Sequence, residues 1–67
     1  MENDITATEV SGHTTVFWAG KAIGEFTKLK GGKYQLWGYC KNGDVTEDTG
    51  WYTWKAAISW VVLASAQ

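Results

Sequence analysis

Three short turn signals divide the middle of this 67-residue chain into segments of similar length. They are Gly20-Lys21, Gly31-Gly32 and Asn42-Gly43, and each contains a residue that tolerates the positive φ angles of a two-residue hairpin turn. Between the turns, apolar residues recur with a period of two, which is typical of half-buried strands. Proline is absent, so no residue lacks the backbone donor that a strand ladder needs. The pattern predicts four antiparallel strands in a meander, near residues 14–19, 22–30, 33–41 and 44–49.

A different pattern begins after the fourth segment. Thr53 has the side chain of a helix N-cap, and residues 54–64 follow it with two alanines near their start. We therefore predict a C-terminal helix over these residues. A terminal strand is the alternative, because β-branched and aromatic residues are frequent in the second half of the segment.

These elements place the chain in the α+β class, as a four-stranded antiparallel meander with one C-terminal helix packed on one face. The length allows one domain, which we assign to residues 14–67. Residues 1–13 are largely polar, with Ile5 and Val10 as their sizeable apolar groups. We interpret them as a polar N-terminal lead-in, with an added edge strand as the alternative.

Two-residue turns would fix which side chains share a face of the sheet. At the second turn a longer loop is the alternative, because Lys30 and Lys33 would repel each other across a two-residue turn. The predicted helix-facing set is Val16, Trp18, Ile23, Leu29, Tyr34, Leu36, Cys40 and Val45. The opposite face would then carry the aromatic rings of Phe17, Phe26, Trp37 and Tyr39. A solvated sheet face rarely carries so much aromatic surface, so this face needs a cover. Trp60 and Leu63 fall away from the apolar stripe of the helix and form a second candidate surface.

The composition also indicates a partner. Hydrophobic residues make up 45% of the chain and aromatic residues 15%, which excludes disorder. A chain of this size buries only about 60% of its unfolded surface, so its core is marginal. A single cysteine excludes an internal disulfide as reinforcement. We expect a non-enzymatic module that forms a homodimer and binds another protein through Phe17, Phe26, Trp37, Tyr39, Trp60 and Leu63.

Binding of single-stranded nucleic acid is the alternative function. Trp37 and Tyr39 lie in the same stretch of sequence as Lys28, Lys33 and Lys41, and such platforms combine stacking rings with cations. The overall charge weighs against this alternative, since the net charge is −1 and the isoelectric point is about 5.6. The basic residues are all lysine, whereas arginine makes most bidentate phosphate and base contacts.

No constellation of residues indicates catalysis. We expect the only histidine, His13, to be a solvated loop residue, and the only cysteine, Cys40, to be a buried and inert thiol. Asp44, Glu47 and Asp48 lie near one turn but lack the spacing of a calcium-binding loop. The sequence therefore predicts no catalytic residue, no metal site and no cofactor.

The chain also carries no predicted membrane segment. Its longest nearly apolar run, Ala56–Ala64, is about half of a membrane span. The first residues are acidic and do not lead into an apolar stretch, as a signal peptide would. An unpaired cysteine fits a reducing compartment, so we expect a cytoplasmic protein that does not bind membranes.

Residues 25–62 resemble the repeat unit of the YegP-like family of small bacterial and archaeal proteins. The resemblance rests on Phe26, Gly32-Lys33-Tyr34-Gln35-Leu36, Asn42-Gly43-Asp44-Val45 and Tyr52-Thr53-Trp54-Lys55-Ala56-Ala57-Ile58. It implies an antiparallel sheet with a covering helix, often in tandem repeats or dimers, and no settled activity. Gly50-Trp51 stands where the family usually has a serine before the tyrosine, and the frequent arginines of its aromatic strand are missing. Lone phage and bacterial domains of this size also include inhibitors of host machinery, so inhibition is a further expectation by analogy.

Overall fold

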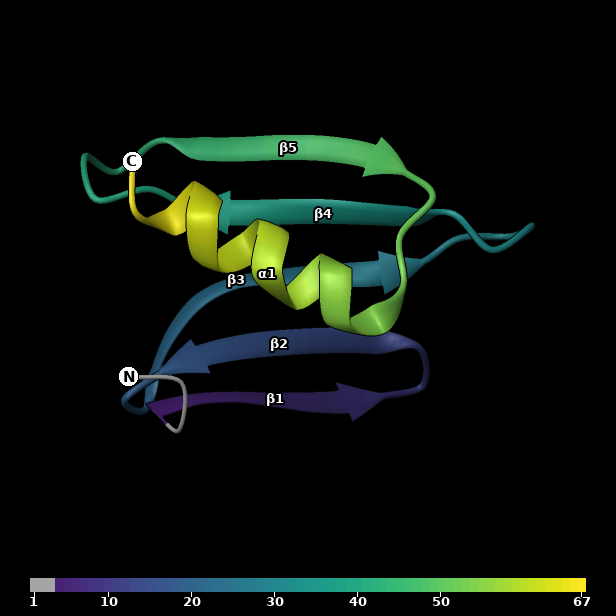
Figure 1. Ribbon diagram of the computed structural model, residues 1–67, viewed down its shortest axis with the longest axis horizontal. Helices are drawn as coiled ribbons and strands as arrows, with labels where there is room; N and C mark the ends of the chain where they lie inside the picture. The colour runs from purple at the N-terminus through teal and green to yellow at the C-terminus, as the bar shows by residue number, and fades with distance from the viewer. Residues whose placement is uncertain (1–3) are drawn as a thin grey trace.

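The computed structural model describes residues 4–67, which form an antiparallel sheet and one helix (Figure 1). The strands follow one another across the sheet in chain order, so each pairs with its sequence neighbours. The elements are β1 (Ile5–Val10), β2 (His13–Trp18), β3 (Lys21–Lys28), β4 (Tyr34–Tyr39), β5 (Val45–Gly50) and α1 (Trp54–Ser65). The α+β class and the antiparallel sheet with a C-terminal helix are thus as predicted. No helix within residues 4–67 combines the length and apolar character that a membrane crossing requires.

The sheet has five strands rather than the predicted four, because β1 lies within the segment interpreted as a lead-in. It joins the sheet through a tight turn at Ser11-Gly12, where both φ angles are positive (51° and 82°), as in a type I′ hairpin. Part of the predicted lead-in therefore forms an edge strand, which was the alternative interpretation. Residues 1–3 of the predicted lead-in lie outside the described residues.

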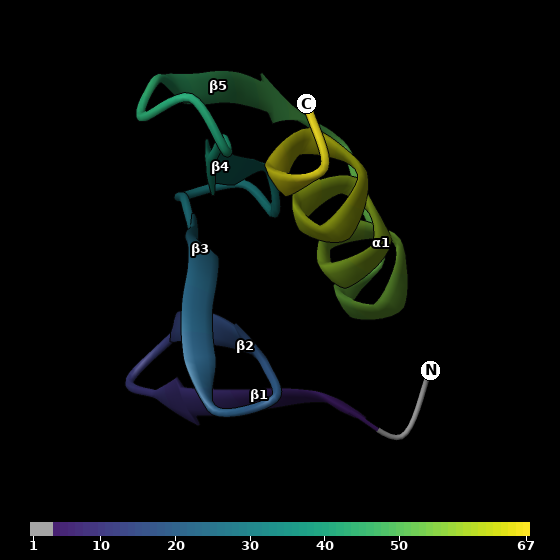
Figure 2. The ribbon, with the colours of Figure 1, turned by 90° about the vertical axis from the view of Figure 1, so that its left-hand side faces the viewer.

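Helix α1 confirms the prediction of a C-terminal helix over that of a strand. The Thr53 side chain accepts a hydrogen bond from the Ala56 backbone N–H at 3.0 Å and so caps the first turn. The helix lies against one face of the sheet and leaves the other uncovered (Figure 2). Its contacts fall mainly on β4 and β3, the strands that run beneath it.

Two of the three predicted turns have three residues instead of two, and the other has two residues but begins one position earlier than predicted. Hydrogen bonds from Leu29 N to Lys33 O and from Cys40 N to Asp44 O close loops of three residues each. The turn between β2 and β3 is formed by Ala19-Gly20 instead of Gly20-Lys21, and the two residues have φ angles of 51° and 85°. Because strand side chains alternate, a slip of one residue moves each side chain to the opposite face.

The slip reverses the predicted faces of β5 and of the part of β3 that pairs with β4, whereas Ile23 packs against the core on the helix side, as predicted. Phe26 pairs with Leu36 and lies fully buried beneath the helix, so its predicted role in binding a partner is wrong. Val45 pairs with Tyr39 and lies on the uncovered face. In β2 and β4, Val16 and Leu36 face the helix as predicted and complete the buried core with Ala57 and Val61 of α1.

Two glycines allow the helix to approach the sheet closely. A Cβ atom at Gly38 would lie 2.5 Å from the Ala64 Cβ, and one at Gly24 would lie 2.5 Å from the Val61 Cγ1. Such separations are far shorter than van der Waals contact, so side chains at these two positions would push α1 away. Gly24 and Gly38 pair with each other across β3 and β4, directly beneath the second half of the helix.

Candidate protein-binding face

The face of the sheet opposite α1 is called the open face below. Strand alternation and the observed register assign it the following residues: Thr6, Thr8, Val10, His13, Thr15, Phe17, Ala22, Glu25, Thr27, Gln35, Trp37, Tyr39, Val45, Glu47 and Thr49. The aromatic members come from β2 and β4, on either side of the central strand. Phe17 and Trp37 are half-buried, and Tyr39 is 36% exposed. Three of the four predicted rings therefore share this face.

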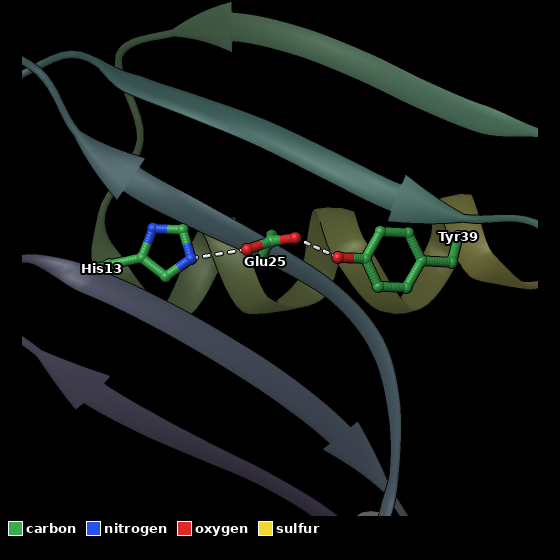
Figure 3. A network of polar contacts seen from close by, with 3 residues as sticks. All are labelled: His13, Glu25 and Tyr39. Atoms are coloured by element: carbon green, nitrogen blue, oxygen red, sulfur yellow. Dashed lines mark hydrogen bonds and ion pairs between the residues drawn. The ribbon is translucent and has the colours of Figure 1, made fainter.

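A carboxylate lies at the centre of the open face and binds a side chain on each side (Figure 3). Glu25 Oε1 lies 2.6 Å from His13 Nε2, and the Tyr39 hydroxyl donates a hydrogen bond to Glu25 Oε2. Glu25 pairs with Thr15 of β2 and Trp37 of β4. His13 and Tyr39 are each two residues from those partners, so they reach Glu25 diagonally across the strands.

These contacts change the proton affinities of the two acidic groups. The hydrogen bond from Tyr39, assisted by His13, lowers the pKa of Glu25 below its usual value. Hydrogen bonding to that carboxylate, together with partial burial, raises the pKa of Tyr39 to about 12. At neutral pH Glu25 is therefore ionised and Tyr39 neutral, which is the state in which the phenol donates and the carboxylate accepts.

The network fixes the orientation of the aromatic groups around it. The His13 ring lies 6.5 Å from the Trp37 ring, centroid to centroid, at an interplanar angle of 37°. The network lies on the surface of the sheet and holds its side chains in place through hydrogen bonds. Ordered aromatic groups with a hydrogen-bonded hydroxyl are typical of protein-binding surfaces.

The two residues of the second predicted surface, on the helix, differ in their exposure. Leu63 is 69% exposed, as predicted, but it belongs to the helix layer on the other side of the sheet. Trp60 is half-buried and packs against the core. Its Cζ3 atom would lie 3.6 Å from a Cβ placed on Gly38. Trp60 therefore helps to hold the helix on the sheet, and its predicted exposure was wrong.

The lysines predicted to accompany the rings lie elsewhere. Lys28 pairs with Tyr34 and belongs to the helix-facing side of β3. Lys33 lies in a loop with its Nζ atom 5.5 Å from the centre of the Trp51 ring, and Lys41 lies in the loop between β4 and β5. Glu25 and Glu47 supply the carboxylates of the open face, and the residues of this face include no lysine. The structure thus separates the cations from the rings that a nucleic-acid platform would combine.

Sequence reasoning missed His13 and Glu25. His13 was expected to be a solvated loop residue, yet it starts β2 and faces Glu25. Alternation within β2 could have placed it with Thr15 and Phe17, but its contact with Glu25 depends on the register of β3.

Cys40 is half-buried in a loop, with its Sγ atom 3.1 Å from Thr46 Oγ1. Among residues 4–67, no group of three or more His, Cys, Asp or Glu side chains could hold a metal ion.

Comparisons of the chain with protein-family models, with curated proteins and with solved structures give no match. The resemblance of residues 25–62 to the YegP-like family therefore stays a prediction.

Proposed function

We propose that this protein is a non-enzymatic binding module that associates through its open face, and that the occupant of this face is a second copy of the chain. The two open faces would pack against each other as the two sheets of a sandwich, about 10 Å apart. No described residue adds support to inhibition of host machinery, so the proposal is limited to self-association.

The observation that carries the proposal is the pairing of polar groups within the open face. Glu25 is bound by His13 and Tyr39, and Thr49 Oγ1 donates to Gln35 Oε1 at 2.6 Å. Burying a polar group is costly chiefly when its hydrogen bonds with water are not replaced. These polar groups already form hydrogen bonds with one another. A partner that covers the face would therefore leave fewer polar atoms without a hydrogen bond while it buries the apolar surface of the rings.

The size and charge of the molecule fit a second copy as the partner. The principal extents of the Cα trace along the two long axes are 31 and 23 Å. One face therefore offers on the order of 700 Å² to a partner, close to the roughly 800 Å² per partner of a standard stable interface. The net charge of −1 gives little repulsion between copies.

Sedimentation equilibrium of the parent chain and matched variants tests this proposal. We expect the parent to be dimeric on the order of 100 μM, and Trp37→Ala to weaken the dimer by about thirtyfold, as loss of an interface anchor does. Val45→Lys provides a second disruption, since Val45 is 54% exposed on the open face and a substitution there leaves the core intact. Leu63→Ala is the control, because it removes exposed apolar surface from the other layer.

A monomeric parent at that concentration would contradict the proposal, as would equal weakening by the Leu63 and Val45 variants. Circular dichroism confirms that each variant is folded. Titration with a single-stranded oligonucleotide tests the alternative. Quenching of tryptophan fluorescence that disappears with added salt, together with loss of that quenching in Trp37→Ala, would favour nucleic acid as the occupant of the face.

A further inference from the structure

We propose that a cavity at one end of the sheet is a binding site for a small anion with an apolar body, such as an aromatic carboxylate or sulfonate. The cavity has a volume of about 460 Å³, within the range of roughly 300–1,000 Å³ that is common for ligand sites. It lies between the β2–β3 hairpin, the end of β4 and the end of α1. Its lining includes Trp18, Lys21, Ile23, Cys40, Lys41 and Ala66.

A β-bulge creates this opening. Val16 pairs with Gly24 and Phe17 pairs with Ala22, so Ile23 is an extra residue in β3 without a partner in β2. The pairing of β3 with β4 ends at Gly24 and Gly38. The first residues of β3 therefore follow β2 and curve away from β4, as Figure 1 shows. Bulges that redirect a strand in this way are frequent beside binding sites.

Two lysines border the cavity. Lys21 enters its lining from the hairpin and Lys41 from the loop after β4, and the lining contains no carboxylate side chain. Within residues 4–67, neither ammonium group forms an ion pair with a carboxylate. Two cations that border one apolar cavity favour an anionic group between them.

The end of the helix, which carries partial negative charge, is already hydrogen-bonded. The Val62 carbonyl accepts from the Ser65 hydroxyl at 2.9 Å, and the Leu63 carbonyl accepts from Ala66 N at 3.3 Å. The Ala64 carbonyl accepts from Gln67 N at 3.2 Å and lies 3.5 Å from Cys40 Sγ. The repulsion that these carbonyls would exert on an anion is thereby reduced.

The rest of the lining determines the body of the ligand. Trp18 is 40% exposed, and Ala22, Ile23 and Ala66 add apolar surface beside it. A flat aromatic body can lie against the indole, as aromatic rings do in binding pockets. The ligand class is therefore an apolar, preferably aromatic, acid. Ala22 and Tyr39 belong both to this lining and to the open face, so the cavity lies at the edge of that face.

The probe for this site is 8-anilinonaphthalene-1-sulfonate, compared with N-phenyl-1-naphthylamine, which has the same rings without the sulfonate. We expect the sulfonate to bind and the neutral compound to bind at least about tenfold more weakly, because only the former meets the two ammonium groups. Lys21→Gln combined with Lys41→Gln should weaken binding of the sulfonate about tenfold. The matched control is Lys30→Gln combined with Lys55→Gln, which removes the same charge outside the cavity.

Amide chemical shifts of the labelled protein show where the probe binds. Shifts confined to residues 18–23, 39–41 and 65–66 support the proposal. Absence of binding, equal affinity of the two lysine double variants, or shifts centred on Phe17 and Trp37 of the open face would overturn it. Failure of the cavity site leaves the sedimentation result unchanged, so the two proposals fail separately.

Discussion

The covered face and the open face of the sheet both carry aromatic side chains, but they are built differently. Beneath the helix, Phe26 and Leu36 are completely buried, and Gly24 and Gly38 remove the atoms that would hold the helix off. On the open face the rings are only half-buried, and a carboxylate at the centre binds side chains on both sides. Aromatic content alone therefore does not define a core. Close backbone approach distinguishes the covered face, whereas internal pairing of polar groups distinguishes the open one.

The strongest test of this comparison truncates one phenylalanine on each face. Phe26→Ala should lower the free energy of unfolding by about 3–5 kcal/mol, since it leaves a cavity at the centre of the core. A domain of this size has little more stability than that, so we expect the variant to be largely unfolded. Phe17→Ala should cost less than about 1.5 kcal/mol, because its ring is already partly hydrated.

Urea unfolding followed by circular dichroism measures both values. The protein is kept dilute so that association does not contribute to stability. An equal loss of unfolding free energy in Phe26→Ala and Phe17→Ala would show that the open face is part of the core and would contradict the distinction between the two faces.

The next test concerns the close approach of helix and sheet. Gly38→Ala should destabilise the protein by about 1–3 kcal/mol, because its new methyl group would lie 2.5 Å from the Ala64 Cβ. Ala64→Gly removes that methyl group at a cost of about 1 kcal/mol in helix propensity. If the contact is responsible, the double variant loses less stability than the sum of the two single variants, in the same urea experiment. Strict additivity would mean that the glycine is needed for another reason.

The smallest expected effect is electrostatic and belongs to the open face. Glu25→Gln should return the pKa of Tyr39 from about 12 towards its ordinary value of 10. Absorbance of the phenolate at alkaline pH measures this change. Tyr52 provides an internal reference, because its own hydrogen bond to Asp48 raises its pKa independently of Glu25.

The same titration has a consequence for stability. The folded state holds the Tyr39 proton more tightly than the unfolded chain does, so the contribution of this group is complete below pH 10 and is lost as the pH rises towards 12. The lowered pKa of Glu25 acts at the other end, where stability falls as the pH drops below the usual carboxyl range. Unfolding curves of Glu25→Gln that show the same alkaline loss as the parent would contradict the assignment to this network.

Much of the fold follows from the sequence, because local chemistry determines it. Alternation between glycine-containing turns predicts the meander, and Thr53 correctly predicts the start of the helix. The faces of β3 and β5 could not be predicted as reliably, since they depend on whether a loop has two residues or three. Gly32 and Gly43 occupy the last position of their three-residue loops with positive φ, a position that commonly takes glycine. A glycine with positive φ is also compatible with a two-residue turn, so it does not reveal the loop length. The one-residue difference in loop length placed Phe26 on the open face in the prediction, where the structure has Glu25.

The strictly consecutive order of the strands bears on how the chain folds. Each strand reaches its neighbour through a turn of two or three residues, so no pairing requires a long segment to close first. The main non-local step is the return of α1 over β4 and β3, which lie one and two hairpins before β5, the strand that leads into the helix. We therefore expect folding to be faster than in β-sandwiches of comparable size, with hairpins forming early and the helix docking last.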